Sequence, residues 1–193
     1  MIMDSRTVLY KLKDYKSPKS KITQLIKKNE LIQIRRGLFE TDPSAPPYAL
    51  LSAVYGPSYL SFEYALYWYN IIHERVSVIT GAVFGKNKIK EFQTPFGFYL
   101  YQPVPKAVYP YDVDIHTENG YSWQMASPEK ALCDTLYKAP PLKNVSELQS
   151  MLFDSLGMEE RVLRSLKRND IRFLAPRYGR KNTMLLLQFL EGA

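Results

Sequence analysis

Hydrophobic residues near the start of the chain recur at helical spacing. Two segments show this pattern, residues 4–13 and 18–28, and apolar side chains three or four positions apart share one face of a helix. We therefore predict two short amphipathic helices. Ser17 is a good N-cap for the second helix, and Pro18 suits its first position. The apolar stripes are Val8, Leu9 and Leu12 in the first segment, and Ile22, Leu25 and Ile26 in the second.

The pattern changes after Asn29, a residue type that often ends a helix. Short apolar segments then flank Arg35, Arg36 and Gly37, and glycine supplies the backbone freedom that a tight hairpin needs. The predicted order within 40 residues is helix, helix, β-hairpin. This order is the outline of a winged helix-turn-helix, in which a hairpin lies beside the recognition helix.

Three prolines within residues 41–47 are typical of a linker. We predict a winged-helix domain at 1–41, a linker at 42–47 and an α+β domain at 48–193. The fold class is therefore α+β, with a small, mainly antiparallel sheet and C-terminal helices in the second domain. Helices are expected near residues 48–55, 61–72, 127–137, 145–155, 159–168 and 183–191. Strands are expected near residues 76–80, 96–102, 111–116 and 121–125.

Composition narrows the class of protein. Apolar residues make up 46% and charged residues 23% of the 193, which is ordinary for a globular protein. No apolar run approaches the roughly 18 residues that a membrane-spanning helix requires. The N-terminus has no apolar signal core, and Cys133 has no second cysteine to pair with. We expect a cytoplasmic protein without a membrane segment or a disulfide, in which Cys133 is a small core residue.

The net charge of +7 is unevenly distributed along the chain. The first 40 residues hold ten Lys and Arg against four Asp and Glu, whereas residues 41–140 hold seven against nine. Residues 141–193 hold nine against six. Such asymmetry fits a polyanion-binding N-terminal region, and it equally fits a solvated basic surface.

The second predicted helix and the hairpin supply the residue types that DNA binding requires. Cations on one surface match the regular array of phosphates, and polar side chains on a helix can reach base edges in the major groove. The alternative is a winged helix that contacts only proteins, with lysines for solubility. The candidate DNA-binding residues are Lys16, Ser17, Lys19, Ser20, Lys21, Thr23, Gln24, Lys27, Lys28, Arg35 and Arg36.

A second basic group lies in the last third of the chain. Three of its arginines are spaced to share one face of a helix near residues 159–168. This group could contact nucleic acid or an acidic partner, or it could be a solvated helix face. Its members are Arg161, Arg164, Arg168, Arg177, Arg180 and Lys181.

Four potential metal ligands alternate along one predicted strand, namely Asp112, Asp114, His116 and Glu118. A metal-dependent nuclease would need such groups to converge with a lysine. We favour instead the wet face of an antiparallel strand, with Val113 and Ile115 toward the core. We predict no catalytic residues, no metal site and no cofactor, and we expect the protein not to be an enzyme.

Three segments resemble the AbiEi family of antitoxins. They are residues 22–39 (ITQLIKKNELIQIRRGLF), 59–66 (YLSFEYAL) and 125–134 (MASPEKALCD). The first is similar to the end of the family's winged helix and the others to parts of its second domain. The head departs from the family's fuller three-helix arrangement, because residues 14–17 leave little room for another helix.

The resemblance implies a transcriptional regulator and antitoxin of a type IV toxin–antitoxin system in phage defence. Such a protein would bind operator repeats of its own promoter as double-stranded DNA, with two copies on a repeat, and repress its operon. It would also counteract a nucleotidyltransferase-like toxin, with or without direct contact. The competing hypotheses are a metal-dependent nuclease with a winged-helix targeting head and a winged-helix protein-interaction module.

Overall fold

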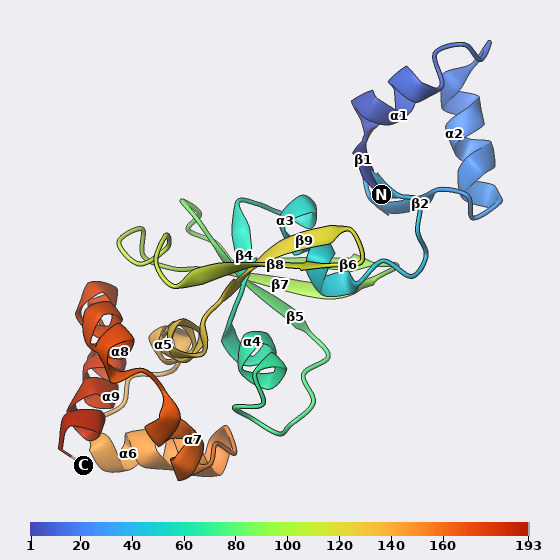
Figure 1. Ribbon diagram of the computed structural model, residues 1–193. Helices are drawn as coiled ribbons and strands as arrows, with labels where there is room; N and C mark the ends of the chain where they lie inside the picture. The colour runs from blue at the N-terminus through green and yellow to red at the C-terminus, as the bar shows by residue number, and fades with distance from the viewer. Residues whose placement is uncertain (193) are drawn as a thin grey trace.

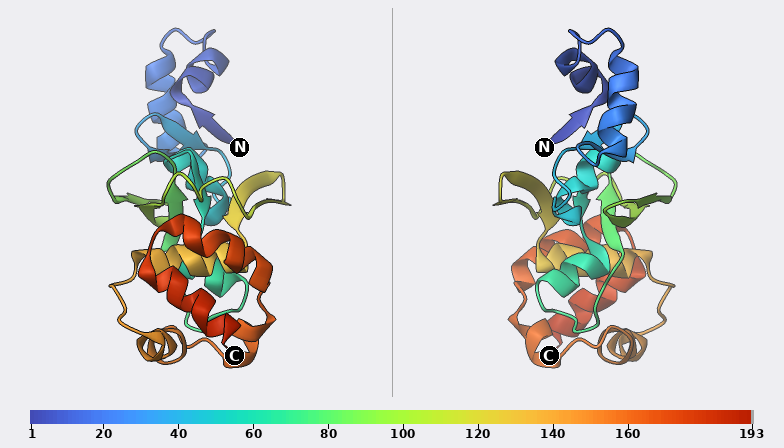
Figure 2. Two further views of the ribbon diagram at one scale, coloured as in Figure 1. Left: turned by 90° about the vertical axis from the view of Figure 1, so that its left-hand side faces the viewer. Right: turned by 90° about the vertical axis from the view of Figure 1, so that its right-hand side faces the viewer.

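The computed structural model describes residues 1–192 and shows a mixed α+β protein, described below as a head and a body (Figure 1). A small N-terminal unit, residues 1–41, is called the head. The body comprises a central six-stranded sheet and the helices that cover it, which continue to the C-terminus. The views in Figure 2 place the head at one end of the molecule and the C-terminal helices at the other. Within residues 1–192, every helix is too short or too polar to span a bilayer.

The head consists of two helices backed by a three-stranded antiparallel sheet, with strand order β1-β3-β2. Its own small core is formed by Met3, Val8, Leu31 and Phe39, against which the apolar stripes of both helices pack. The first strand was not predicted, because three residues give no readable alternation. The elements are β1 (Ile2–Asp4), α1 (Ser5–Lys11), α2 (Pro18–Lys27), β2 (Ile32–Arg35) and β3 (Leu38–Glu40).

The hairpin of the head joins it to the body. Its turn is only two residues long, Arg36 and Gly37, and Gly37 has a φ of 82°, which favours glycine. The Gly37 carbonyl accepts the N–H of Ser5 at 3.0 Å, which fixes the turn beside the start of α1. Ile34 and Leu38 belong to the main core of the body, whereas Phe39 belongs to the core of the head. The hairpin therefore packs into both cores.

The central sheet is mixed, with strand order β6-β7-β5-β4-β9-β8. The pairs β4–β9 and β5–β7 are parallel, and the other three pairs are antiparallel. The sequence did not reveal the parallel pairs, since a parallel pairing depends on distant segments. The strands are β4 (Ser58–Leu60), β5 (Ile79–Val83), β6 (Lys90–Thr94), β7 (Gly97–Pro103), β8 (Val113–Glu118) and β9 (Tyr121–Ala126).

Helices occupy the segment before the sheet, one face of it and the C-terminal third. Before and beside the sheet lie η1 (Pro47–Leu50), α3 (Leu51–Val54) and α4 (Phe62–Trp68). The next helix, α5 (Pro128–Lys138), lies between the sheet and the C-terminal helices (Figure 1) and is buried over most of its length. Cys133 on α5 is fully buried, as expected. The remaining helices are α6 (Val145–Gln149), η2 (Ser150–Ser155), α7 (Glu160–Ser165), α8 (Arg168–Leu174), η3 (Ala175–Tyr178) and α9 (Lys181–Glu191).

The single helix predicted at 159–168 is wrong: the chain breaks there into α7 and α8. Leu166 turns into the core and leaves helical geometry. The buried carboxylate of Glu129 on α5 accepts the N–H of Lys167 at 2.8 Å, so this N–H makes no helical hydrogen bond. Arg168 therefore begins a new helix and does not share a helix face with Arg161 and Arg164.

A fully buried carboxylate, Asp134 on α5, ties the three layers of the body together. It accepts hydrogen bonds from the hydroxyls of Tyr59 at 3.0 Å and Ser61 at 2.6 Å, at the end of β4. It also accepts one from Tyr178 in η3 at 2.6 Å. Lys130, one turn earlier on α5, places its ammonium 3.7 Å from the same carboxylate. One ion pair thus links the sheet, α5 and the C-terminal helices.

The ammonium of Lys130 is also fully buried and has neutral oxygen partners. It donates to the carbonyl of Val108 at 2.7 Å and to the hydroxyl of Tyr178 at 3.0 Å. Burial lowers the pKa of Lys130, and the neighbouring Asp134 opposes that change. Burial raises the pKa of both Tyr59 and Tyr178 well above the usual value, so both phenols remain protonated donors. Because the network is sealed from solvent, we assign it to stability.

Replacing Asp134 with Ala should lower the free energy of unfolding by about 3–5 kcal/mol, because Lys130 would be left as an unpaired buried charge. Urea denaturation followed by tryptophan fluorescence measures the change. The matched control is Asp154→Ala on η2, an exposed acid, which should change stability by no more than about 0.5 kcal/mol. A similar small loss for both variants would contradict the role assigned to the network.

Candidate nucleic-acid interface

The exposed side of α2 carries the polar residues that the sequence predicts. Lys19, Ser20, Thr23, Gln24 and Lys27 are exposed, and no residue of the helix is fully buried. The opposite stripe packs against the core of the head. The helix is therefore held from one side only, and its other face is open to a partner.

Local hydrogen bonds decide which polar groups on α2 are available. Ser17 is the N-cap residue as predicted, but its hydroxyl lies 2.8 Å from that of Ser20 and caps no backbone N–H. The hydroxyl of Thr23 donates back to the carbonyl of Lys19 at 3.3 Å. Gln24 keeps both its amide donor and its acceptor outside any hydrogen bond within residues 1–192. The first-turn N–H groups and Gln24 are thus open to a ligand.

The cations of the head that are predicted to bind DNA have no acidic partners. None of them forms an ion pair with a carboxylate of residues 1–192, whereas the N-terminal ammonium of Met1 pairs with the buried Glu40. Lys21 is half-buried, and its ammonium lies 4.9 Å from the centre of the Tyr15 ring, an aromatic and not an acidic neighbour. Uncompensated like charges on one small unit repel each other, and a polyanion would relieve that repulsion. These cations are Lys16, Lys19, Lys21, Lys27, Lys28, Arg35 and Arg36.

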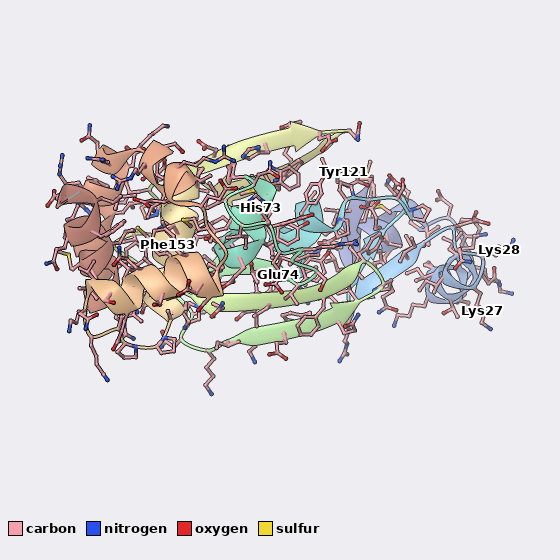
Figure 3. All side chains as sticks on the ribbon, turned by 90° about the horizontal axis from the view of Figure 1, so that it is seen from below. Lys27, Lys28, His73, Glu74, Tyr121 and Phe153 are labelled. Carbon is pink, nitrogen blue, oxygen red and sulfur yellow. The ribbon has the colours of Figure 1, made fainter. Side chains whose placement is uncertain are left out.

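The two arginines of the hairpin are exposed but lie near the body. Burial raises the pKa of Tyr101 on β7, and the positive charge of Arg35 partly opposes that rise. Arg35 is therefore close to the central sheet, because Ile34 and Leu38 dock the hairpin there. In contrast, Lys27 and Lys28 lie at the end of the molecule farthest from Phe153 on η2 (Figure 3). The hairpin is a short turn at the junction between head and body.

The second predicted basic group is largely compensated or held by the body. Arg161 pairs with Glu159, and Arg164 pairs with Glu160 on the same helix. Arg177 stacks on the ring of Phe173 at 3.6 Å, and Lys181 donates to the carbonyl of Lys143 at 2.6 Å. Arg168 is exposed on α8, and Arg180 lies 5.3 Å from the centre of the Tyr137 ring. The six residues are spread over α7, α8, η3, and the start of α9 with the residue before it, and they form no single helix face.

The acidic residues around β8 do not form a metal site. Glu118 accepts the hydroxyl of Tyr48 at 3.0 Å, while His116 stacks on Trp123 with ring centres 5.7 Å apart. Asp112 precedes the strand in a left-handed conformation, and burial raises its pKa. No group of three His, Cys, Asp or Glu residues in the described part of the chain could hold a metal ion. Residues 1–192 therefore contain no set of metal ligands of the kind that the nuclease hypothesis requires.

The predicted inward face of β8 is only partly correct, because Val113 packs against the main core but Ile115 does not. Ile115 is 74% exposed, whereas His116 is half-buried against Trp123. Gln124, which lies opposite Ile115 on β9, is exposed as well, so this side of the two strands faces solvent at that pair. Alternation of residue types along an edge strand did not predict which side is buried.

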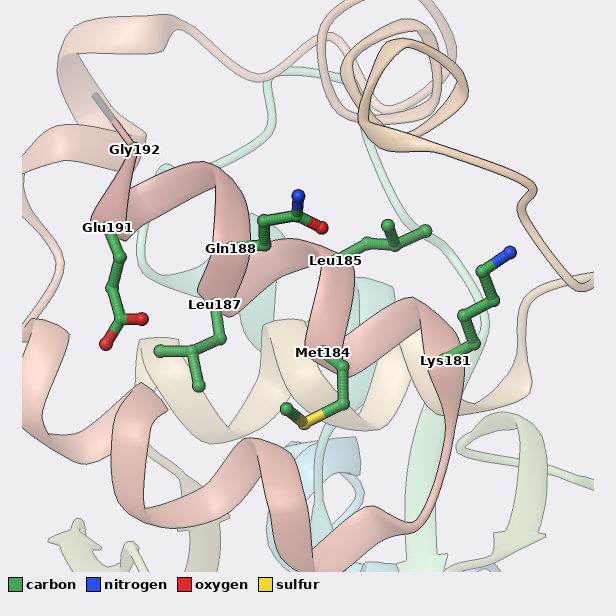
Figure 4. Close-up of a pocket in the computed structure, with 7 residues that line it drawn as sticks. All are labelled: Lys181, Met184, Leu185, Leu187, Gln188, Glu191 and Gly192. Atoms are coloured by element: carbon green, nitrogen blue, oxygen red, sulfur yellow. The ribbon is translucent and has the colours of Figure 1, made fainter.

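A depression of about 560 Å³ along α9 does not qualify as a site either. Its walls come from one helix and the glycine that follows it, and half of its side chains are apolar and half polar (Figure 4). Met184 in it is 43% exposed. A binding site is normally a cavity in which several segments of the chain bring a few polar groups together. This depression is lined by a single segment of the chain.

Two lysines that line a pocket of the structure, Lys86 and Lys106, were not among the predicted site residues. They lie in the segment whose net charge is negative, so summing charge over residues 41–140 concealed them.

No protein-family model matches the chain, and no curated protein matches it.

The head cations should be removable without loss of stability, since they have no ion-pair partners within residues 1–192. In the triple variant Lys19→Gln, Lys27→Gln, Lys28→Gln, each substitution should change the free energy of unfolding by no more than about 0.5 kcal/mol. Thermal unfolding followed by circular dichroism measures this. A large loss would mean that these residues support the fold and are not a free surface.

Proposed function

We propose that this protein is a DNA-binding transcriptional regulator that presents α2 to the major groove. The observation that carries the proposal is the uncompensated positive charge on and around an exposed polar helix face. The cations of the C-terminal third differ, since several of them have acidic partners. An α-helix fits the major groove, and positive side chains without acidic partners on its exposed face favour a nucleic-acid partner.

In this proposal the head acts as an abbreviated winged helix. Two helices followed by an antiparallel hairpin support it, with β1 completing the sheet. Lys19, Lys27 and Lys28 would contact phosphates, and the open N–H groups at the start of α2 would donate hydrogen bonds to another phosphate. Gln24 is the best candidate for reading a base, because glutamine pairs with adenine through two hydrogen bonds. Arg35 and Arg36 would follow the backbone beside the groove.

The resemblance to AbiEi antitoxins extends the proposal. The protein would repress its own operon by occupying operator repeats, with two copies on a repeat, and would act without enzymatic chemistry. It would also counteract a nucleotidyltransferase-like toxin. The cytoplasm is the compartment in which both activities would take place.

DNA binding can be tested by fluorescence anisotropy with a duplex from the protein's own promoter and an unrelated duplex, over a range of salt concentrations. We expect binding that weakens steeply with salt. The variant with Lys19, Lys27 and Lys28 changed to Gln should bind both duplexes more weakly and reduce the salt slope by about three. The control changes Lys143, Arg161 and Arg164 to Gln, which removes the same charge at the far end. Equal effects of the two variants would contradict the assigned surface.

Gln24→Ala tests base reading separately from charge. It should weaken binding to the promoter duplex by about 1–3 kcal/mol, leave the unrelated duplex unaffected and keep the salt slope. The same anisotropy titrations measure it. Equal loss on both duplexes would assign Gln24 to the backbone, and no DNA binding at low salt would favour a head that contacts only proteins.

The antitoxin role requires a different experiment. Co-expression with the product of the adjacent gene should restore growth if that product is a nucleotidyltransferase-like toxin. The variant that cannot bind DNA is informative here, because rescue by it separates neutralisation from repression. Failure of the parent protein to rescue growth would remove the antitoxin role and leave the DNA-binding proposal standing.

A further inference from the structure

A polar pocket of about 340 Å³ lies on the body, at one edge of the central sheet. It contains two lysines, Lys86 and Lys106, an amide side chain, Asn87, and no acidic residue. Both lysines are exposed. The other lining residues are Gly85, Pro103, Val104, Pro105 and Tyr137.

Strand topology explains why these segments meet. The strands β5 and β7 are parallel neighbours, and Val83 pairs with Pro103 at their carboxyl ends. The residues that follow each strand, Lys86 after β5 and Lys106 after β7, therefore emerge at the same edge. The carboxyl ends of adjacent parallel strands are a common place for ligands in α/β sheets.

Two further cations lie beside the ring of Tyr137, a lining residue of the pocket at the end of α5. The guanidinium of Arg180 lies 5.3 Å from the centre of the Tyr137 ring, and the ammonium of Lys138 lies 5.9 Å from it. Burial lowers the pKa of Lys138, and the charge of Arg180 lowers it further. Four separate segments thus bring positive charge to one place.

No carboxylate balances this charge. Among the residues that the structure describes, Lys86, Lys106, Lys138 and Arg180 form no ion pair with an acid. Lys86 has an aromatic neighbour, since its ammonium lies 5.6 Å from the centre of the Tyr55 ring. Concave shape, several donors and uncompensated positive charge together favour a small anion with more than one negative group.

We propose that this pocket binds the phosphate groups of a small ligand that carries more than one negative charge. Lys86 and Lys106 would contact the phosphate oxygens directly, and Asn87 would donate its amide. Lys138 and Arg180 would add long-range attraction. The site is on the body and does not depend on the function proposed for α2.

Isothermal titration calorimetry of the full chain at low ionic strength tests the proposal, with sodium tripolyphosphate and ATP as the probes. We expect binding with a Kd below about 1 mM. The variant Lys86→Gln, Lys106→Gln should weaken the affinity at least about tenfold, which is 1.4 kcal/mol. Asn87→Asp provides a second variant, because it adds a negative charge to the pocket without removing a lysine, and it should weaken binding as well.

The matched control is Lys143→Gln, Arg161→Gln, which removes the same charge from two exposed cations outside the pocket and should keep the affinity for both probes. Tighter binding of ATP than of tripolyphosphate would support recognition of the nucleoside as well as the phosphates, and equal binding would support a site for phosphates alone. The proposal is overturned if neither probe binds, or if the control variant loses as much affinity as the pocket variants. It is also overturned if Lys86→Gln, Lys106→Gln weakens binding of duplex DNA but not of tripolyphosphate.

Discussion

The buried ion pair of Lys130 and Asp134 is the constraint on which the rest of the body depends. Removing two charges from water is strongly unfavourable, and the pair is tolerable only because each charge also has good hydrogen-bond partners. Those partners come from the end of β4, the connection after β7 and η3, so all of these must be in place at once. The same arrangement positions the basic pocket, because Tyr137 follows the buried part of α5 and Arg180 lies two residues after Tyr178.

Positive charge plays different physical roles in different parts of the chain. In α7 and α8 it is largely neutralised by neighbouring glutamates, such as Glu160 beside Arg164 and Glu191 beside Arg172. The lysines and arginines of the head, and those of the pocket after β5 and β7, have no acidic partner within residues 1–192. Composition cannot distinguish these cases, because pairing depends on the fold. The function proposed for α2 and the ligand proposed for the pocket both follow from this difference.

Local patterns predicted the elements that depend on local sequence, and failed where distant contacts decide. The spacing of Ile22, Leu25 and Ile26 correctly indicated α2 and its exposed polar face. The break between α7 and α8 depends on Glu129, which is far away in the sequence. The parallel pairing of β5 and β7 was equally hidden, and with it the meeting of Lys86 and Lys106. The position of Arg35 near Tyr101 follows from docking of the hairpin, which no local pattern encodes.

The central claim is that the exposed face of α2 is the nucleic-acid-binding surface. The most direct measurement is a titration of isotope-labelled protein with promoter duplex, followed through the amide resonances. The account predicts that the largest shifts fall on residues 16–28 and on the turn at Arg36 and Gly37, and that they diminish as salt is raised. Shifts confined to α7, α8 and α9, or no shifts at low salt, would contradict it.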